Sequence, residues 1–154
     1  MKVRITVGEE TKLNGYLNID PITKFDDVAV DIRNIDEVVE NASCKELISD
    51  HILGFLEKEE AIRVLKGYMK KIRHNGTIIV SEIDSYEVAR SFYRKEIDSD
   101  FFNKAVHGNF SHPWDVKMSS YTLEELADIL ASGGFKIIKK RLNGIRLTIE
   151  AQRP

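Results

Sequence analysis

A helix that leads directly into an apolar strand constrains the fold of this chain more than any other feature. Apolar residues recur at helical spacing over residues 61–72, with glutamates before them and basic residues at the end of the segment. His74-Asn75-Gly76 is typical of a helix stop, and the β-branched run from Thr77 to Ile83 predicts a strand at the centre of a sheet. Since parallel neighbours need long crossovers, this unit favours a mostly parallel sheet.

Shorter strands are predicted before this unit, because β-type residues there alternate or cluster between turn residues. They cover residues 3–7, 16–19, 28–30 and 44–49. Two of them are followed by an acid, Asp20 and Asp31. In an open parallel sheet, ligands bind outside the carboxyl ends of the strands. We therefore expect Asp20, Asp31, the loop after Val7 and the segment after Ser49 to line one crevice.

The C-terminal half adds two predicted helices and a hairpin. One helix runs from Tyr86 to about Lys95, and another begins at Thr122, whose spacing to Glu125 is that of a capping box. Residues 103–121 between them are expected to be irregular. The last two strands flank Asn143-Gly144, a dipeptide that favours a type I′ turn. Together these elements predict an α/β fold, with a mostly parallel sheet covered on both faces and one domain over residues 1–154.

Composition and charge exclude several classes of function. With 42% hydrophobic and 31% charged residues among 154, the chain can form one adequate core. Its formal net charge of -2 gives no bulk attraction to nucleic acid or anionic membranes, and it has no apolar run of about 18 residues. The single cysteine, Cys44, is expected to be a buried thiol. Because one cysteine forms no internal disulfide and no signal-type run follows Met1, a cytoplasmic location is expected.

Five segments follow one another in an order that is moderately specific. They are VGEETKLNGYLNID, VAVDIRN, CKELISDHILGFL, VLKGYMKKIRHNGTIIVSEID and HGNFSHPWDVKMSSYTLEELADILASGGFKI. Together they cover nearly the whole chain and resemble the small class I S-adenosylmethionine-dependent methyltransferases of polysaccharide gene clusters and phage-like genomes. The resemblance implies a Rossmann-like three-layer sandwich with a C-terminal antiparallel hairpin strand. It also implies a methyltransferase that acts on a small-molecule or sugar acceptor.

The resemblance assigns residues to the cofactor S-adenosylmethionine. The family's first loop, which holds the methionine part, matches Val7-Gly8-Glu9-Glu10 and Gly15, and the acid that bonds the ribose hydroxyls matches Asp20. The pair that flanks the adenine matches Asp31 and Ile32. The segment that borders the methyl-transfer face matches Ser49, Asp50 and His51.

Two residues of the first loop depart from the family pattern. Glu9 and Glu10 stand where the family has a cysteine and a glycine, and glycine permits positive φ and close backbone approach. Two carboxylates there would repel the cofactor's carboxylate but attract its ammonium or sulfonium. This departure predicts weak or lost binding and leaves an alternative, a degenerate non-catalytic protein that serves as a binding or scaffold module. A domain for another adenosine ligand would also use Asp20 and Asp31.

Methyl transfer asks little of the protein beyond alignment, with a general base where the acceptor loses a proton. Candidate bases are His51, His107, His112 and Asp115. His107, His112 and Asp115 also form a weak pattern for a metal site, and a loop corner in which Trp114 packs is a further reading of SHPWD. We keep His51, His112 and Asp115 as catalytic candidates and expect no metal. The sequence indicates neither the acceptor nor the oligomeric state.

Overall fold

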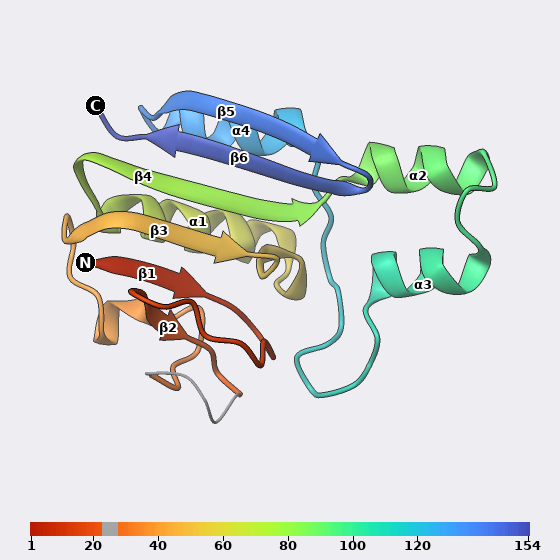
Figure 1. The fold of residues 1–154 in the computed structure, drawn as a ribbon, viewed down its shortest axis with the longest axis horizontal. Helices are drawn as coiled ribbons and strands as arrows, with labels where there is room; N and C mark the ends of the chain where they lie inside the picture. Colours follow the sequence, from red (N-terminus) through yellow and green to blue (C-terminus); the bar gives the residue numbers. More distant parts are fainter. Residues whose placement is uncertain (23–27) are drawn as a thin grey trace.

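The computed structural model describes residues 1–22 and 28–154, and six strands of that part form one sheet (Figure 1). In spatial order they are β2 (Leu17–Ile19), β1 (Lys2–Ile5), β3 (Cys44–Asp50), β4 (Ile72–Ile83), β6 (Arg146–Gln152) and β5 (Lys136–Asn143). Strands β1 to β4 are parallel, and β6 is antiparallel to both of its neighbours. The predicted α/β class, with a mostly parallel sheet and a C-terminal hairpin, is confirmed.

Each of the helices α1 to α4 begins with a side chain that accepts hydrogen bonds from free N–H groups of the first turn. The helices and their caps are α1 (Lys58–Lys71) with Glu57, α2 (Ser85–Tyr93) with Asp84, α3 (Ser99–His107) with Asp98, and α4 (Leu123–Ser132) with Thr122. Two 3-10 turns, η1 (Ile35–Glu37) and η2 (Leu53–Phe55), flank β3.

Within the described residues, none of the helices has the length and apolar character needed to cross a membrane.

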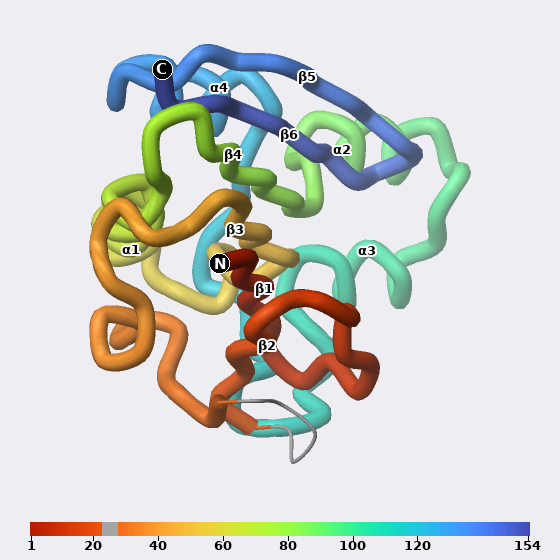
Figure 2. Tube along the Cα trace, turned by 60° about the vertical axis from the view of Figure 1, so that its left-hand side comes forward, coloured from red at the N-terminus to blue at the C-terminus, as the bar shows by residue number. Residues whose placement is uncertain are grey.

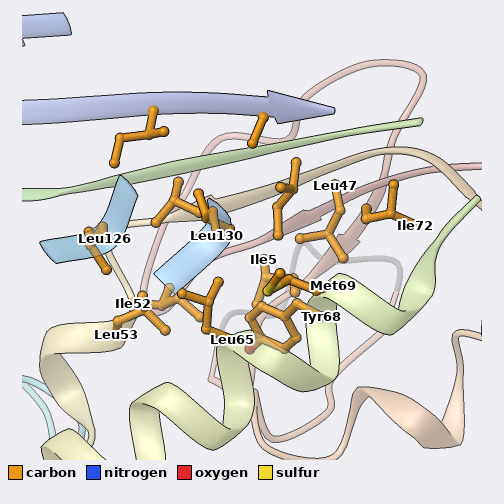
Figure 3. Close-up of a cluster of buried hydrophobic side chains, with 14 of the residues drawn as sticks. Ile5, Leu47, Ile52, Leu53, Leu65, Tyr68, Met69, Ile72, Leu126 and Leu130 are labelled. Carbon is orange, nitrogen blue, oxygen red and sulfur yellow. The ribbon is translucent and has the colours of Figure 1, made fainter. Parts of the chain in front are cut away.

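The apolar core lies between one face of the sheet and the helices α1 and α4, which share that side of the molecule in Figures 1 and 2. Full burial of one large aliphatic side chain contributes about 1.5–3 kcal/mol, so this layer supplies most of the hydrophobic stabilisation. Figure 3 shows side chains of both helices pointing toward the strands, among them Leu65, Tyr68, Met69, Leu126 and Leu130 opposite Ile5 and Leu47.

No helix covers the other face of the sheet in the described part of the chain (Figures 1 and 2), and polar side chains lie on it beside Ile48 and Ile79. Lys2 Nζ lies 3.6 Å from Glu46 Oε1 there, and the hydroxyls of Ser81 and Thr148 are 3.3 Å apart. Helices α2 and α3 pack against each other beyond the carboxyl ends of the strands, where the rings of Phe92 and Phe102 stack. Of the predicted sandwich, the structure thus shows the sheet and the layer formed by α1 and α4.

Two local predictions were wrong in the segments between the long elements. Residues 28–30 form a single bridge, between Val28 and Ile19, instead of a strand. Helix α3 occupies the beginning of the stretch 103–121 that we expected to be irregular. The sequence does contain features of this helix, because Asp98 caps it and apolar residues recur four positions apart. The polar residues of the segment 96–100 made the start of the helix look like a loop.

The helix stop predicted at His74-Asn75-Gly76 was also wrong. Helix α1 ends at Lys71, and β4 begins at the next residue, so the tripeptide is an irregularity within the strand. Asn75 has a φ of 58°, and a Cβ atom on Gly76 would lie 2.8 Å from the carbonyl oxygen of Cys44. The glycine is therefore required by the close approach of β3 and β4 and not by a helix end.

The hairpin turn is shifted by one residue from its predicted place. Asn143 pairs with Arg146, so Gly144 and Ile145 are the two central residues. Among these, only Gly144 has a positive φ, of 60°. A positive φ at the first central position alone is the pattern of a type II′ turn, which takes glycine there, instead of the predicted type I′.

Cys44 opens β3 and is fully buried, as expected for a structural thiol. Its burial raises the pKa of the thiol, which keeps it protonated and unreactive near neutral pH.

One carboxylate interrupts the apolar face of β4. Ile78, Val80 and Glu82 alternate on the buried side, and Glu82 is only 4% exposed. Its Oε1 accepts a hydrogen bond of 2.7 Å from the N–H of Leu53. Burial raises the pKa of Glu82 to about 7, although the neighbouring charges of His51 and Lys117 act in the opposite direction.

This buried acid makes the stability of the protein depend on pH. The folded protein binds the proton of Glu82 more tightly than the unfolded chain does, in which the pKa of this side chain lies near the ordinary glutamate value of 4.5. The free energy of unfolding should therefore fall by up to about 3 kcal/mol as the pH rises from 5 to 8. Denaturant unfolding of Glu82→Gln at several pH values should show a flatter dependence, whereas Glu150→Gln, on the open face, should keep the slope. Equal slopes in the wild type and Glu82→Gln would contradict the assignment.

Candidate functional site

A polar crevice lies at the carboxyl ends of β1 and β3, where open α/β sheets bind ligands. Its volume is about 400 Å³, within the range of small-molecule sites. Its walls are formed by Arg4, Thr6, Val7, Glu9, Asp50, His51, Phe55 and Arg146. A larger groove of about 690 Å³ runs between α1 and α4, but it lies at the amino ends of the parallel strands. We therefore place the candidate site in the smaller crevice.

Arg4 connects three parts of the crevice. Its Nε and Nη2 atoms donate to Asp50 Oδ2 at 3.1 and 2.7 Å, and its Nη1 donates to the carbonyl oxygen of Thr11 at 2.9 Å. Glu9 Oε2 lies 4.0 Å from Nη2 of the same side chain. Arg4 thus joins β1 to the end of β3 and to the loop after β1. With Arg146, the crevice has two cations and two carboxylates, so its formal charges balance.

His51 is held in a strained and specific orientation at the end of β3. Its φ is 55°, which is costly for a residue with a side chain, and its N–H donates to the carbonyl oxygen of Ser81 at 2.9 Å. The imidazole Nδ1 lies 2.9 Å from Asp50 Oδ1. The hydrogen bond from His51, followed by that from Arg4, lowers the pKa of Asp50 to about 2, so Asp50 is an acceptor and Nδ1 carries the proton.

The other ring nitrogen of His51 is buried and has no hydrogen-bond partner within residues 1–22 and 28–154. Ser49 Oγ, two residues earlier, is in the same condition. Buried polar atoms in native structures are nearly always paired, so two such atoms at one strand end indicate a place that a ligand or water completes. Because Nδ1 holds the proton, the free Nε2 lone pair of His51 is available to accept one.

Asp20 organises the loop after β1. It is fully buried, its Oδ2 accepts from Thr6 Oγ1 at 2.8 Å and from the N–H of Glu9 at 3.1 Å, and its Oδ1 accepts from the N–H of Ile22 at 3.0 Å. The carboxylate that the resemblance assigns to ribose binding thus accepts hydrogen bonds from other residues of the protein. Gly8 has a φ of 76° between these contacts, a conformation that favours glycine.

The two glutamates of the loop have different environments. Glu9 Oε1 accepts from the N–H and the hydroxyl of Thr11, at 3.2 and 2.9 Å, and its other oxygen faces Arg4. Glu10 is exposed to solvent. The loop therefore uses one glutamate to close its own turn and to extend a negative charge into the crevice. Gly15, with a φ of 83°, lies further along, in the turn before β2.

The place that the resemblance assigns to adenine carries an ion pair. Arg33 donates to Asp31 through Nε at 2.9 Å and through Nη2 at 2.7 Å, and this interaction lowers the pKa of Asp31. The guanidinium of Arg33 lies over the ring of Trp114, 5.3 Å from its centre. Ile32 is fully buried, and its carbonyl oxygen accepts from the hydroxyl of Tyr68 at 2.6 Å.

The connection between α3 and α4 supplies Trp114, and we call its residues 109–117 the strap. His112 lies against the loop after β1, because a Cβ atom on Gly8 would come within 2.8 Å of His112 Nε2. Asp115 folds the strap on itself: its Oδ1 accepts from the N–H of Asn109 at 3.0 Å, and its Oδ2 accepts from the N–H and hydroxyl of Ser111 at 3.2 and 2.5 Å. The strap thus spans from the loop to Arg33.

The three catalytic candidates are not brought together. His51 faces the crevice, His112 covers Gly8, and Asp115 is turned into the strap. In the described part of the chain, no group of three or more His, Cys, Asp or Glu residues is placed to hold a metal ion. The residues of the crevice that sequence reasoning missed are Arg4 and Arg146. The only signal for them was a charged residue at a strand position with apolar neighbours.

The residues present fit one half of S-adenosylmethionine better than the other. Glu9, Arg4 and Arg146 provide opposite charges for an ammonium and a carboxylate in the open crevice. On the adenosine side, Asp20 accepts a hydrogen bond from Thr6 and Asp31 pairs with Arg33. Trp114 of the strap stacks on Arg33. The charges of the crevice therefore match the methionine half, whereas the two acids on the adenosine side already bond other residues of the protein.

No protein-family model matches this sequence, and no curated protein matches it. Solved structures are similar in fold. A Burkholderia thailandensis 1,6-didemethyltoxoflavin-N1-methyltransferase, with 1,6-didemethyltoxoflavin and S-adenosylhomocysteine bound, is 14% identical with a TM-score of 0.60, over 90% of this chain and 62% of that one. A possible histamine N-methyltransferase from Thermotoga maritima is 14% identical with a TM-score of 0.58, over 89% of this chain and 72% of that one.

A putative methyltransferase from Haloferax volcanii, in complex with the activator Trm112, is 9% identical with a TM-score of 0.63, over 99% of this chain and 82% of that one. The chain is shorter than several of these proteins and spans 35% of an O-methyltransferase family protein from Burkholderia thailandensis. At such identities the similarity shows the fold alone. The chain has the Rossmann-like fold of the class I S-adenosylmethionine-dependent methyltransferases.

Proposed function

We propose that this protein binds S-adenosylmethionine in the crevice and transfers its methyl group to a small-molecule or sugar acceptor. The observation that carries the proposal is His51, with Nδ1 held by an ionised carboxylate and a buried Nε2 that lacks a partner among the described residues. Solved neighbours support the choice of chemistry, since one of them has S-adenosylhomocysteine and 1,6-didemethyltoxoflavin bound. A single domain over residues 1–154 and a cytoplasmic location, compatible with the free thiol of Cys44, belong to the same proposal.

The proposed cofactor contacts follow the charges of the crevice. Glu9 receives the ammonium of the methionine part, and Arg4 with Arg146 receives its carboxylate. Val7, Gly8 and Gly15 shape the loop, while Asp20 with Asp31 and Ile32 border the ribose and adenine. Ser49 and Asp50 line the end of β3. When bound, the cofactor supplies an activated methyl group on a sulfonium, so the protein contributes alignment and proton removal.

His51 is the proposed general base. Its Nε2 accepts a proton from the acceptor's nucleophile, and Asp50 stabilises the imidazolium that forms, because its carboxylate already holds Nδ1–H. We assign His112 and Asp115 a different role, since Asp115 uses both oxygens within the strap and His112 contacts the cofactor loop. In this proposal they position the strap.

A non-catalytic binding or scaffold module is the second candidate, and one observation favours it. The chain's own groups occupy the adenosine side of the site, through Asp20 with Thr6 and through Asp31 with Arg33 beneath Trp114. A protein that never binds the cofactor would keep these contacts permanently. The three predictions that follow distinguish the two candidates.

Replacing His51 with Gln should slow methyl transfer by about a hundredfold or more, because general base catalysis contributes about 10²- to 10⁴-fold. Affinity for S-adenosylhomocysteine should change little, since Nε2 acts on the acceptor. The measurement is S-adenosylhomocysteine release with a panel of small acceptors, together with calorimetric titration. His74→Gln, at the opposite end of β4, is the matched control. Unchanged turnover in His51→Gln would remove His51 from the mechanism.

Glu9→Gln should weaken S-adenosylmethionine binding about fivefold, because a partly exposed charge pair contributes up to about 1 kcal/mol. Glu10→Gln should have no effect, because Glu10 is exposed and its neighbour carries the contact with Arg4. Titrations of both variants at low and high salt provide the test, and high salt should reduce the difference between them. An equal effect of the two substitutions would show that Glu9 does not contact the cofactor.

Trp114→Ala should tighten binding of S-adenosylmethionine, because the strap then leaves Arg33 and Asp31 more readily and a larger fraction of the protein is binding-competent. Phe110→Ala is the control, since Phe110 lies on the same strap with a side chain 64% exposed. Calorimetric titration compares the affinities. Weaker binding in Trp114→Ala would mean that Trp114 contacts the cofactor, and no binding by any variant would favour the scaffold candidate.

A further inference from the structure

A second, more enclosed cavity lies between η2, the end of β4 and the helices α2 and α3. Its volume is about 180 Å³. Aliphatic and aromatic side chains of the two helices and of β4 form much of its wall, and three serines also line it. The apolar members are Ile83, Val88, Ala89, Phe102, Ala105 and Val106. An apolar cavity of about 150 Å³ is large enough to bind benzene, so this cavity has room for one six-membered ring with a small substituent.

Two ionisable side chains enter this apolar wall, Glu82 and Lys117. Glu82 is 4% exposed, and its Oε1 accepts from the N–H of Leu53 at 2.7 Å. Its Oε2 borders Gly54, where a Cβ atom would lie 3.6 Å away. Lys117 Nζ donates to the carbonyl oxygen of Ala105 at 2.9 Å. A carboxylate has about four acceptor positions and an ammonium has three donors, so both groups keep capacity for a ligand.

The charges of this pair restrict the ligand. The buried carboxylate of Glu82 and the partly buried ammonium of Lys117 balance in charge, and a ligand with a net charge would leave one of them without a compensating partner, which is unfavourable. A neutral ligand that carries both a donor and an acceptor would instead bond Glu82 and Lys117 together. The ring of such a ligand would contact the apolar wall, and the volume of the cavity limits the ligand to a single ring.

We propose that this cavity is a binding site for a neutral, single-ring molecule with one hydrogen-bond donor directed at Glu82 and one acceptor directed at Lys117. An aromatic or heteroaromatic carboxamide is the simplest compound of this class. The site does not depend on the crevice for its chemistry. If the proposed methyltransferase function holds, the cavity also identifies the acceptor class, because it adjoins the crevice of His51 at η2, where Phe55 lines the crevice and Gly54 lines the cavity.

Four probes of nearly equal size test the polar requirement: benzamide, benzoate, benzylamine and toluene. Binding is followed by two-dimensional NMR titration of the whole chain at pH 8, where Glu82 is ionised, and without S-adenosylmethionine. Benzamide should bind at least tenfold more tightly than each of the other three. Equal affinity for benzamide and toluene would show that the cavity binds its ligand by apolar contacts alone, and would overturn the proposal.

Substitutions of the charged pair should change which probe is preferred. Lys117→Met leaves an unbalanced anion, so benzylamine should become the best ligand, and Glu82→Gln leaves an unbalanced cation, so benzoate should. Ala105→Phe fills the cavity and should abolish binding of every probe, whereas Ala131→Phe, on the exposed side of α4, should not. An unchanged order of affinities in both charge variants would contradict the proposal.

These titrations use no cofactor, so they stand apart from the test of methyl transfer. Binding of benzamide without any turnover would support the cavity and count against the enzyme. Turnover of acceptors with no benzamide binding, and with Ala105→Phe fully active, would support the enzyme and overturn the cavity assignment.

Discussion

The ion pair between Arg4 and Asp50 is the interaction on which the rest of the site depends. Arg4 lies in β1 and Asp50 ends β3, so their two hydrogen bonds fix the neighbouring strand ends. The same guanidinium holds the loop after β1 through Thr11, and the same carboxylate orients His51. Because the pair is only partly exposed and two donors of Arg4 bond Asp50 Oδ2, its contribution is larger than that of a typical surface ion pair. Position of the loop and direction of the imidazole are thus set by one contact.

The open face of the sheet explains how a short chain supports such a site. Parallel sheets are usually covered on both faces, and their strands are then apolar throughout. Here alternate residues of β1 and β6 are polar, as are Glu46 and Asp50 in β3, and ion pairs such as that of Lys2 with Glu46 satisfy these side chains in the presence of water. The charge of Arg4, which would be costly under a helical layer, is compatible with the fold for this reason.

The sequence allowed the sheet to be predicted because its period and composition are local properties. The segment 77–83 and the cap at Thr122 needed no knowledge of the rest of the chain. The site was harder to predict from the sequence. The sequence placed Asp20 and His51 at strand ends, but the burial of Asp20 beneath its own loop depends on contacts made across the fold. Glu82 was hidden for a similar reason, since an acid within an apolar alternation reveals its cavity only after α2 and α3 are placed.

The strap has fixed ends, and this determines what its movement costs. Gly108, with a φ of 91°, joins it to α3, and at the other end the N–H of Met118 donates to the carbonyl oxygen of Gly54 at 2.8 Å. The strap has about ten residues, and its ends would stay anchored if it lifted. Its gain in conformational entropy would then be that of a short closed loop, because the entropic cost of closing a loop grows only with the logarithm of its length. If the strap lifts as proposed, it would close again on the timescale of about 10–100 ns that applies to a loop of this size. Residence time at the crevice would then be governed by side-chain contacts such as that of Trp114 with Arg33, and not by reassembly of the backbone.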